Sequence, residues 1–169
     1  MVCGLYKKYN YKKEFKMNLK ITTKNFDDLY KLKCNPKYIM MLENLIYSFA
    51  ANKSSNQYQS GSWKSVSIEN KEISFWYFEL KLPIICWLKN TSTFSFVNEN
   101  KQKDELVSSK CFSILCLTFA LNYLINLIYE DETATELTTE LTSLYYLINM
   151  NIELILDENE VEIFQSIID

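Results

Sequence analysis

The fold is decided by the stretch WKSVSIENKEISFWYFEL, which spans residues 63–80. Its second half is dense in the β-branched and aromatic residues that favour strands. Its first half carries Trp63, Val66 and Ile68 and ends in a turn at residues 69–72, where an asparagine can take a left-handed conformation. We therefore predict an antiparallel hairpin at the centre of the chain.

Two shorter strand-like segments follow the hairpin, Ile84 to Leu88 and Thr93 to Val97. Pro83 separates the first of them from the hairpin and marks it as an irregular or edge strand, because proline cannot donate to a ladder. A charged surface loop is expected at residues 98–105. Together these segments predict a three- or four-stranded antiparallel meander within residues 62–98.

Helical patterns lie on both sides of the predicted sheet. A short helix is expected at residues 25–33, and Asn35-Pro36 is typical of the start of a longer one. The buried stripe of that longer helix is expected to hold Met41, Leu42, Leu45, Ile46 and Phe49.

Three more helices are expected after the sheet. The first runs from a cap at Ser108 or Ser109 to Tyr129, the second carries Leu137, Leu141, Leu144, Tyr145 and Ile148 on one face, and the third spans about Glu158 to Ile168 with Val161, Phe164, Ile167 and Ile168 on one face. The predicted fold class is α+β: a small three- or four-stranded antiparallel sheet packed by one preceding helix and about three C-terminal helices. The 108–129 helix is expected to be the central partner of the sheet.

The stretch from Cys111 to Tyr129 contains 19 residues without a charge. This length approaches the roughly 20 residues that cross a bilayer, so a single membrane span is an alternative. Asn122 and Asn126 argue against it, because two asparagines in an isolated span are costly. We expect a buried core helix.

Composition excludes much of enzyme chemistry. The 169 residues include no His and no Arg, and all 18 basic residues are Lys. The chain therefore lacks an imidazole base, a His-ligated metal and a bidentate guanidinium. With only two Gly, the chain cannot form a Gly-rich phosphate-binding loop. The five Cys are odd in number and form no CxxC pair, which favours reduced, buried thiols over disulfides or zinc. We expect no enzyme activity, no catalytic residues, no metal site and no cofactor.

Charge is distributed unevenly along the chain, although the net charge is only −3. Residues 1–53 hold 11 Lys against four acids, whereas residues 130–169 hold 11 acids and no Lys. Residues 1–16 carry five Lys and four aromatic residues and are expected to form a basic, Tyr-rich, poorly ordered N-terminal arm without a secretory signal. Residues 17–169 are expected to form a single α+β domain.

The acidic C-terminal region is the candidate partner-binding surface. Its residues are Glu132, Glu136, Glu140, Glu158, Glu160, Glu162 and Asp169. The first three recur at intervals of four, so a helix places their carboxylates in a row roughly 6 Å apart, close to the phosphate spacing along a DNA strand. The alternative is an ordinary solvated helix face.

The chain resembles the ArdB/KlcA antirestriction family over roughly residues 39–169. The resemblance rests on Tyr58, Gly61, Trp63, Asn70, Phe119-Ala120-Leu121, Tyr145, Tyr146 and the end Ile167-Ile168-Asp169. The tyrosines, Gly61, Trp63 and Asn70 are expected to be mainly structural. The chain departs from the family at Ser60, Lys71 and Glu72, where the family has glycine.

The resemblance implies a cytoplasmic, non-enzymatic protein that is carried by plasmids and other mobile elements and protects their DNA. It implies a type I restriction–modification complex, or a related host defence component, as the protein partner. Two alternatives remain open at this point: an immunity or antitoxin protein whose acidic face covers a basic toxin, and a nucleic-acid binder that uses the Lys- and Tyr-rich arm.

Overall fold

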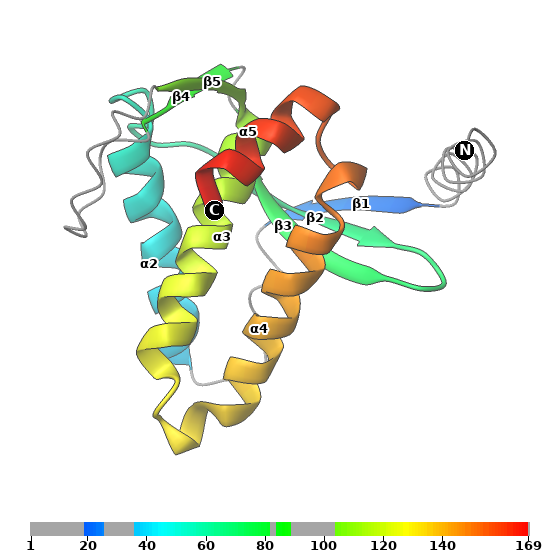
Figure 1. The fold of residues 1–169 in the computed structure, drawn as a ribbon. Helices are drawn as coiled ribbons and strands as arrows, with labels where there is room; N and C mark the ends of the chain where they lie inside the picture. Colours follow the sequence, from blue (N-terminus) through cyan, green and yellow to red (C-terminus); the bar gives the residue numbers. More distant parts are fainter. Residues whose placement is uncertain (1–18, 26–35, 82–83, 89–103, 169) are drawn as a thin grey trace.

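The computed structural model describes residues 19–25, 36–81, 84–88 and 104–168. In these residues four helices and two antiparallel sheets form an α+β fold (Figure 1). Helix α2 (Pro36–Lys53) precedes the central hairpin, and α3 (Ser109–Ile128), α4 (Thr135–Met150) and α5 (Glu158–Ile168) follow it. Helix α3 contacts α2, α4, α5 and strands of both sheets. The predicted fold class and the central position of this helix are confirmed.

The larger sheet has the strand order β1–β2–β3. Strands β2 (Trp63–Glu69) and β3 (Ser74–Leu80) form the predicted hairpin. Its turn differs from the prediction, because Asn70 does not adopt a positive φ. The Asn70 side chain instead accepts hydrogen bonds from the backbone N–H groups of Glu72 and Ile73, both at 2.8 Å. The turn is therefore held by side-chain capping of the backbone.

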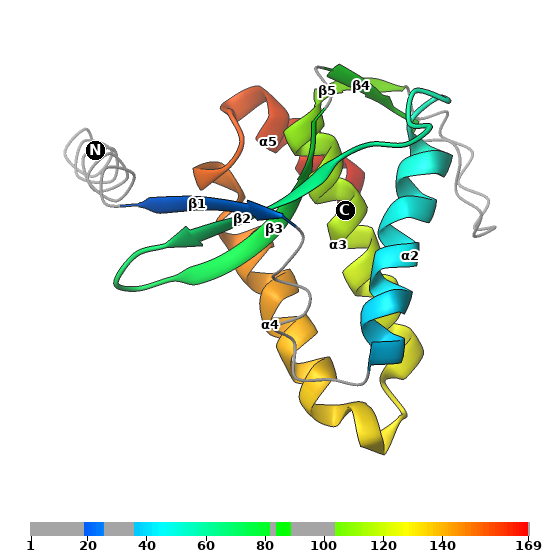
Figure 2. The same cartoon turned by 180° about the vertical axis from the view of Figure 1, so that it is seen from behind.

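Strand β1 (Lys20–Asn25) was not predicted, and it pairs antiparallel with β2. Of the short helix predicted at residues 25–33, Asn25 lies in this strand and residues 26–35 lie outside the described residues. In Figures 1 and 2 the sheet projects to one side of the molecule, and α4 lies across one of its faces.

The smaller sheet pairs β4 (Ile84–Trp87) with β5 (Glu105–Ser108). The single meander was therefore wrong, since β4 joins a second sheet rather than the first. The charged loop predicted at residues 98–105 ends earlier than expected, because Glu105 opens β5; residues 98–103 lie outside the described residues, as does the predicted strand at Thr93–Val97.

Helix α3 begins as predicted, with the Ser108 hydroxyl accepting from the Cys111 N–H at 3.2 Å. It is the one helix in the described residues that is long and apolar enough to cross a membrane, but 67% of its apolar 18-residue stretch is buried inside the fold. Trp87 of β4 packs on it, with ring centroids 5.6 Å from Phe112 and 5.7 Å from Phe119. The helix is thus the core of the domain, as expected.

A buried serine joins α3 to the larger sheet. The Ser113 hydroxyl accepts from the Leu80 N–H at 2.8 Å and donates to the carbonyl of Ser109 at 2.5 Å. Both Leu80 and Ser113 are fully buried. The buried hydroxyl in the second turn of the apolar helix is therefore satisfied by the last residue of β3 and by the helix backbone.

Helices α4 and α5 bury the faces that their spacing predicts, whereas α2 is rotated about its axis relative to the predicted stripe. Helix α4 buries Leu137, Leu141, Leu144 and Ile148, and α5 buries Val161 and Phe164, whereas the predicted Tyr145, Ile167 and Ile168 are only half-buried. In α2, Leu42 and Ile46 are buried as predicted, but Met41, Leu45 and Phe49 are only half-buried. The buried stripe of α2 is Ile39, Leu42, Ile46, Ala50 and Lys53.

Candidate protein-interaction surface

Tyr58 and Trp63 form an aromatic anchor where the chain enters β2. The Trp63 indole N–H donates to the Tyr58 hydroxyl at 3.2 Å, and the two rings meet edge to face with centroids 6.0 Å apart. The Tyr47 ring of α2 also lies close, with its centroid 6.1 Å from that of Trp63. This arrangement ties α2, the loop and β2 together.

Gly61 is required by close packing rather than by its backbone conformation, because its φ is not positive. A Cβ at this position would lie far inside van der Waals contact with Cδ1 of Leu80 and would touch the Tyr58 ring. Leu80 is fully buried beneath it, so its side chain has little room to move.

Gly61→Ala is expected to lower the free energy of unfolding by about 1–2 kcal/mol. The cost of packing an extra methyl group against Leu80 is larger than the stabilisation that alanine gives by reducing the conformational entropy of the unfolded chain. Urea unfolding of this variant and of Ser60→Ala measures the effect. Ser60 is exposed, so its variant is expected to stay within about 0.5 kcal/mol of the parent. Equal stability of the two variants would contradict the packing role of Gly61.

Tyr145 and Tyr146 lie near the end of α4 and point differently. Tyr145 is half-buried against the core, whereas Tyr146 is exposed. Their rings meet edge to face at 5.7 Å. The first is therefore a packing residue, and the second contributes to the surface.

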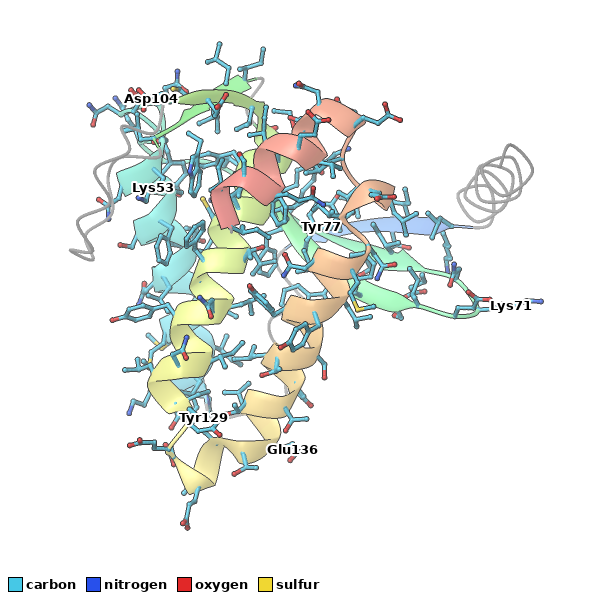
Figure 3. The ribbon with its side chains drawn as sticks, viewed as in Figure 1. Lys53, Lys71, Tyr77, Asp104, Tyr129 and Glu136 are labelled. Atoms are coloured by element: carbon cyan, nitrogen blue, oxygen red, sulfur yellow. The ribbon has the colours of Figure 1, made fainter. Side chains whose placement is uncertain are left out.

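The acidic row begins at the turn that joins α3 to α4. Glu132 opens a short 3-10 helix, η2 (Glu132–Ala134), and Glu136 lies in the first turn of α4; both are exposed, while Glu140 is half-buried. Carboxylates at helix starts are stabilised by the helix dipole. The same turn exposes Glu130 and Tyr129, whose side chain is 76% exposed. We call Tyr129, Glu130, Glu132 and Glu136 the acidic tip; Figure 3 shows Tyr129 and Glu136 at this end of the molecule.

Helix α5, which carries the other predicted carboxylates, lies at the opposite end of the helical layer from the turn between α3 and α4 (Figure 1). Helix α4 has 16 residues and separates the two groups by roughly 24 Å along its axis. Glu158 and Glu162 are exposed, but one Glu160 carboxylate oxygen accepts from the Ser108 N–H at 2.6 Å. Asp169 lies outside the described residues. The six predicted residues that the structure describes therefore do not form one continuous face.

A hydrogen bond that was not predicted from the sequence holds the acidic tip in place. The Tyr38 hydroxyl of α2 donates to the Asp131 carboxylate, 93 residues away in the chain. The other Asp131 oxygen accepts from the Thr133 N–H at 2.9 Å and from its hydroxyl at 2.6 Å. The bonds from Thr133 and Tyr38 lower the pKa of Asp131, and the hydrogen bond to Asp131, followed by burial, raises the pKa of Tyr38. Asp131 thus fixes the turn that carries the exposed carboxylates.

Asp131→Asn is expected to remove a pH-dependent part of the stability. Because the folded state lowers the pKa of Asp131 below its ordinary value of 3.8, this contribution is complete above that value and is lost as pH falls through the folded-state pKa. The stability difference between the parent and Asp131→Asn should therefore stay constant above about pH 5 and shrink between about pH 5 and pH 2 in urea unfolding. A difference that stays constant over this range would show that the ionised carboxylate does not stabilise the turn.

The two buried thiols of α3 are poorly suited to reactivity. Burial raises the pKa of both Cys111 and Cys116, which keeps them in the less reactive thiol form. In the described part of the chain, no group of three or more Cys, Asp or Glu side chains could hold a metal ion. The exposed carboxylates of the acidic tip offer a negative surface for a positively charged partner.

One comparison with solved structures connects this architecture to known proteins. This chain is similar to the structure of the KlcA and ArdB proteins. Those proteins are described as showing a novel fold and antirestriction activity against type I DNA restriction systems in vivo but not in vitro. The match covers 87% of this chain and 94% of that chain, with a TM-score of 0.52 and 17% sequence identity. The chain has the fold of the KlcA and ArdB proteins.

The KlcA/ArdB fold was expected from the resemblance and is confirmed over most of the chain. No protein-family model matches the sequence. No curated protein sequence matches it either. At this identity the structural match establishes the fold alone.

Proposed function

We propose that this chain is a non-enzymatic antirestriction protein, which acts in the cytoplasm to protect mobile-element DNA against a type I restriction–modification system. The observation that carries the proposal is the KlcA/ArdB fold, matched over 87% of this chain and 94% of the other. Those proteins show antirestriction activity against type I DNA restriction systems in vivo.

Protein–protein contact through the acidic tip is the proposed mechanism. Tyr129 supplies a large exposed side chain, and Glu130, Glu132 and Glu136 add exposed negative charge to the same end of the molecule. Aromatic residues are frequent anchors of protein interfaces, and complementary charge speeds and orients docking. The bond between Tyr38 and Asp131 fixes the turn beforehand, which lowers the entropic cost of binding. The partner surface is therefore expected to be basic.

Imitation of a DNA duplex is less well supported than contact with a basic protein surface. A duplex carries one negative charge per roughly 1.7 Å of its axis. This chain has a net charge of −3, and its two acidic groups lie at opposite ends of the helical layer.

The test is the plating of unmodified phage on a type I restricting host, with and without expression of this chain. Because the activity of KlcA and ArdB is described in vivo but not in vitro, the assay is made in cells. Expression is expected to restore plating on the restricting host and to change nothing on the same host without its restriction genes. Unchanged plating on the restricting host, with folded protein present, would refute the proposal.

A further inference from the structure

The outer face of the β4–β5 sheet exposes apolar side chains that the described residues leave uncovered. Side chains alternate across a strand, so Ile85, Trp87 and Val107 fill the core from one face. On the other face Ile84 is 63% exposed and Leu106 is 71% exposed.

The register makes these side chains one patch. Cys86 lies opposite Leu106, and Ile84 lies opposite Ser108. Leu106 is therefore the direct neighbour of Cys86 and the diagonal neighbour of Ile84 on the same face. Cys86 is half-exposed between them.

Both edges of this small sheet are partly closed by other parts of the fold. On β4, the Cys86 N–H donates to the Gln57 side chain at 2.8 Å, and the Leu88 N–H donates to the Lys53 carbonyl at 3.0 Å. On β5, the Ser108 N–H donates to Glu160. These bonds protect the sheet from unspecific strand pairing.

The edge of β5 stays open at Leu106. Because the Cys86 N–H points away from β5, Cys86 and Leu106 form a non-hydrogen-bonded pair, and the Leu106 N–H and carbonyl also point outward. Neither group has a hydrogen-bond partner among the described residues. An extended segment could pair with the backbone at this residue while its side chains cover the apolar face.

Acidic side chains of β5 and α5 lie near the patch. Glu105 opens β5 and directly precedes Leu106 in the chain. Asp104 is exposed next to β5, and α5, which carries the exposed Glu158 and Glu162, contacts that strand. Burial and then the charges of Asp104 and Glu105 raise the pKa of the Cys86 thiol, so the negative field reaches the patch.

From this combination we propose that the β4–β5 face is a second docking surface, which binds an extended protein segment that carries apolar side chains together with lysine or arginine. Leu106 is its centre: its side chain packs against the segment, and its backbone pairs with it. The apolar face favours binding of apolar side chains, and the acidic surroundings select a basic segment over an acidic one. This surface goes beyond the antirestriction function and does not depend on it.

The experiment selects short displayed peptides from a random library on the full-length chain. The enriched sequences are expected to combine alternating apolar residues with Lys or Arg. A synthetic peptide of the enriched sequence should bind more weakly in high salt, and it should slow alkylation of the Cys86 thiol.

Leu106→Ser is the decisive variant, because it removes the exposed apolar side chain and leaves the charge unchanged. It should weaken binding of the synthetic peptide by about tenfold or more. Met150→Ser is the matched control: Met150 is 80% exposed on α4, and its variant should bind like the parent. Equal binding to the Leu106→Ser variant, enrichment of acidic peptides or no enrichment would overturn the proposal. A dimer of the parent chain that Leu106→Ser converts to a monomer would also overturn it, because a second copy would then be the occupant.

Discussion

Reversing two charges of the acidic tip, Glu132→Lys together with Glu136→Lys, is expected to abolish most of the protection. Plating of unmodified phage on the restricting host should fall at least about tenfold relative to cells with the parent chain, because like charges facing a basic surface cost several kcal/mol. Both side chains are exposed, so the loss of protection should not come from loss of the core. The measurement is the plating assay, with soluble protein quantified in the same cells.

A matched control exists at the far end of the β2–β3 hairpin. Glu69 and Glu72 are also exposed, and Glu69→Lys with Glu72→Lys changes the net charge by the same amount. Figure 3 shows the neighbouring Lys71 far from Glu136. The control variant should protect like the parent. If both double variants lose protection equally, net charge matters and the acidic tip does not; if neither loses it, the contact lies elsewhere.

The largest loss of stability is expected from Trp87→Ala. Trp87 is 1% exposed and packs between the rings of Phe112 and Phe119, which connects β4 to the core helix. Removing a buried aromatic side chain of this size costs about 3–5 kcal/mol, a large part of the 5–15 kcal/mol that holds a typical domain folded. Thermal and urea unfolding should both shift to milder conditions.

Tyr146→Ala provides the comparison for that variant. Tyr146 is an exposed aromatic residue of α4, and its loss should change the free energy of unfolding by less than about 0.5 kcal/mol. A Trp87→Ala variant as stable as Tyr146→Ala would contradict the packing of β4 on α3. It would also reopen the alternative in which the apolar helix belongs in a membrane.

Local signals in the sequence were sufficient for several elements. The Ser108 cap, the bounds of α5 and the central hairpin depend on residues close in the chain, and all three agree with the structure. Strand β1 carries a local signal that the prediction missed, the β-branched run Ile21-Thr22-Thr23. Its pairing with β2, which crosses the whole of α2, could not be read from neighbouring residues. Strand β5 begins in a charged segment, and only its pairing with β4 makes it a strand.

The sequence predicted which carboxylates of the acidic tip are exposed, but it did not predict how the candidate surface is arranged in space. Glu132 and Glu136 follow helical spacing and lie on the surface, as predicted. Spacing along the chain gives no information on contacts with distant segments, such as the bond of Glu160 to the Ser108 N–H or that of Asp131 to Tyr38. These contacts fix the turn and tie one predicted surface residue to the fold.

In-cell photo-crosslinking from position 129 tests most directly whether the chain acts by protein contact at the acidic tip. Replacing Tyr129 with benzoylphenylalanine preserves an aromatic side chain at a site that is 76% exposed. During a challenge with unmodified phage, irradiation should join the chain to a subunit of the type I restriction complex, and the product should vanish in a host without those genes. Full protection with no protein crosslink, or with crosslinks to DNA alone, would contradict the account.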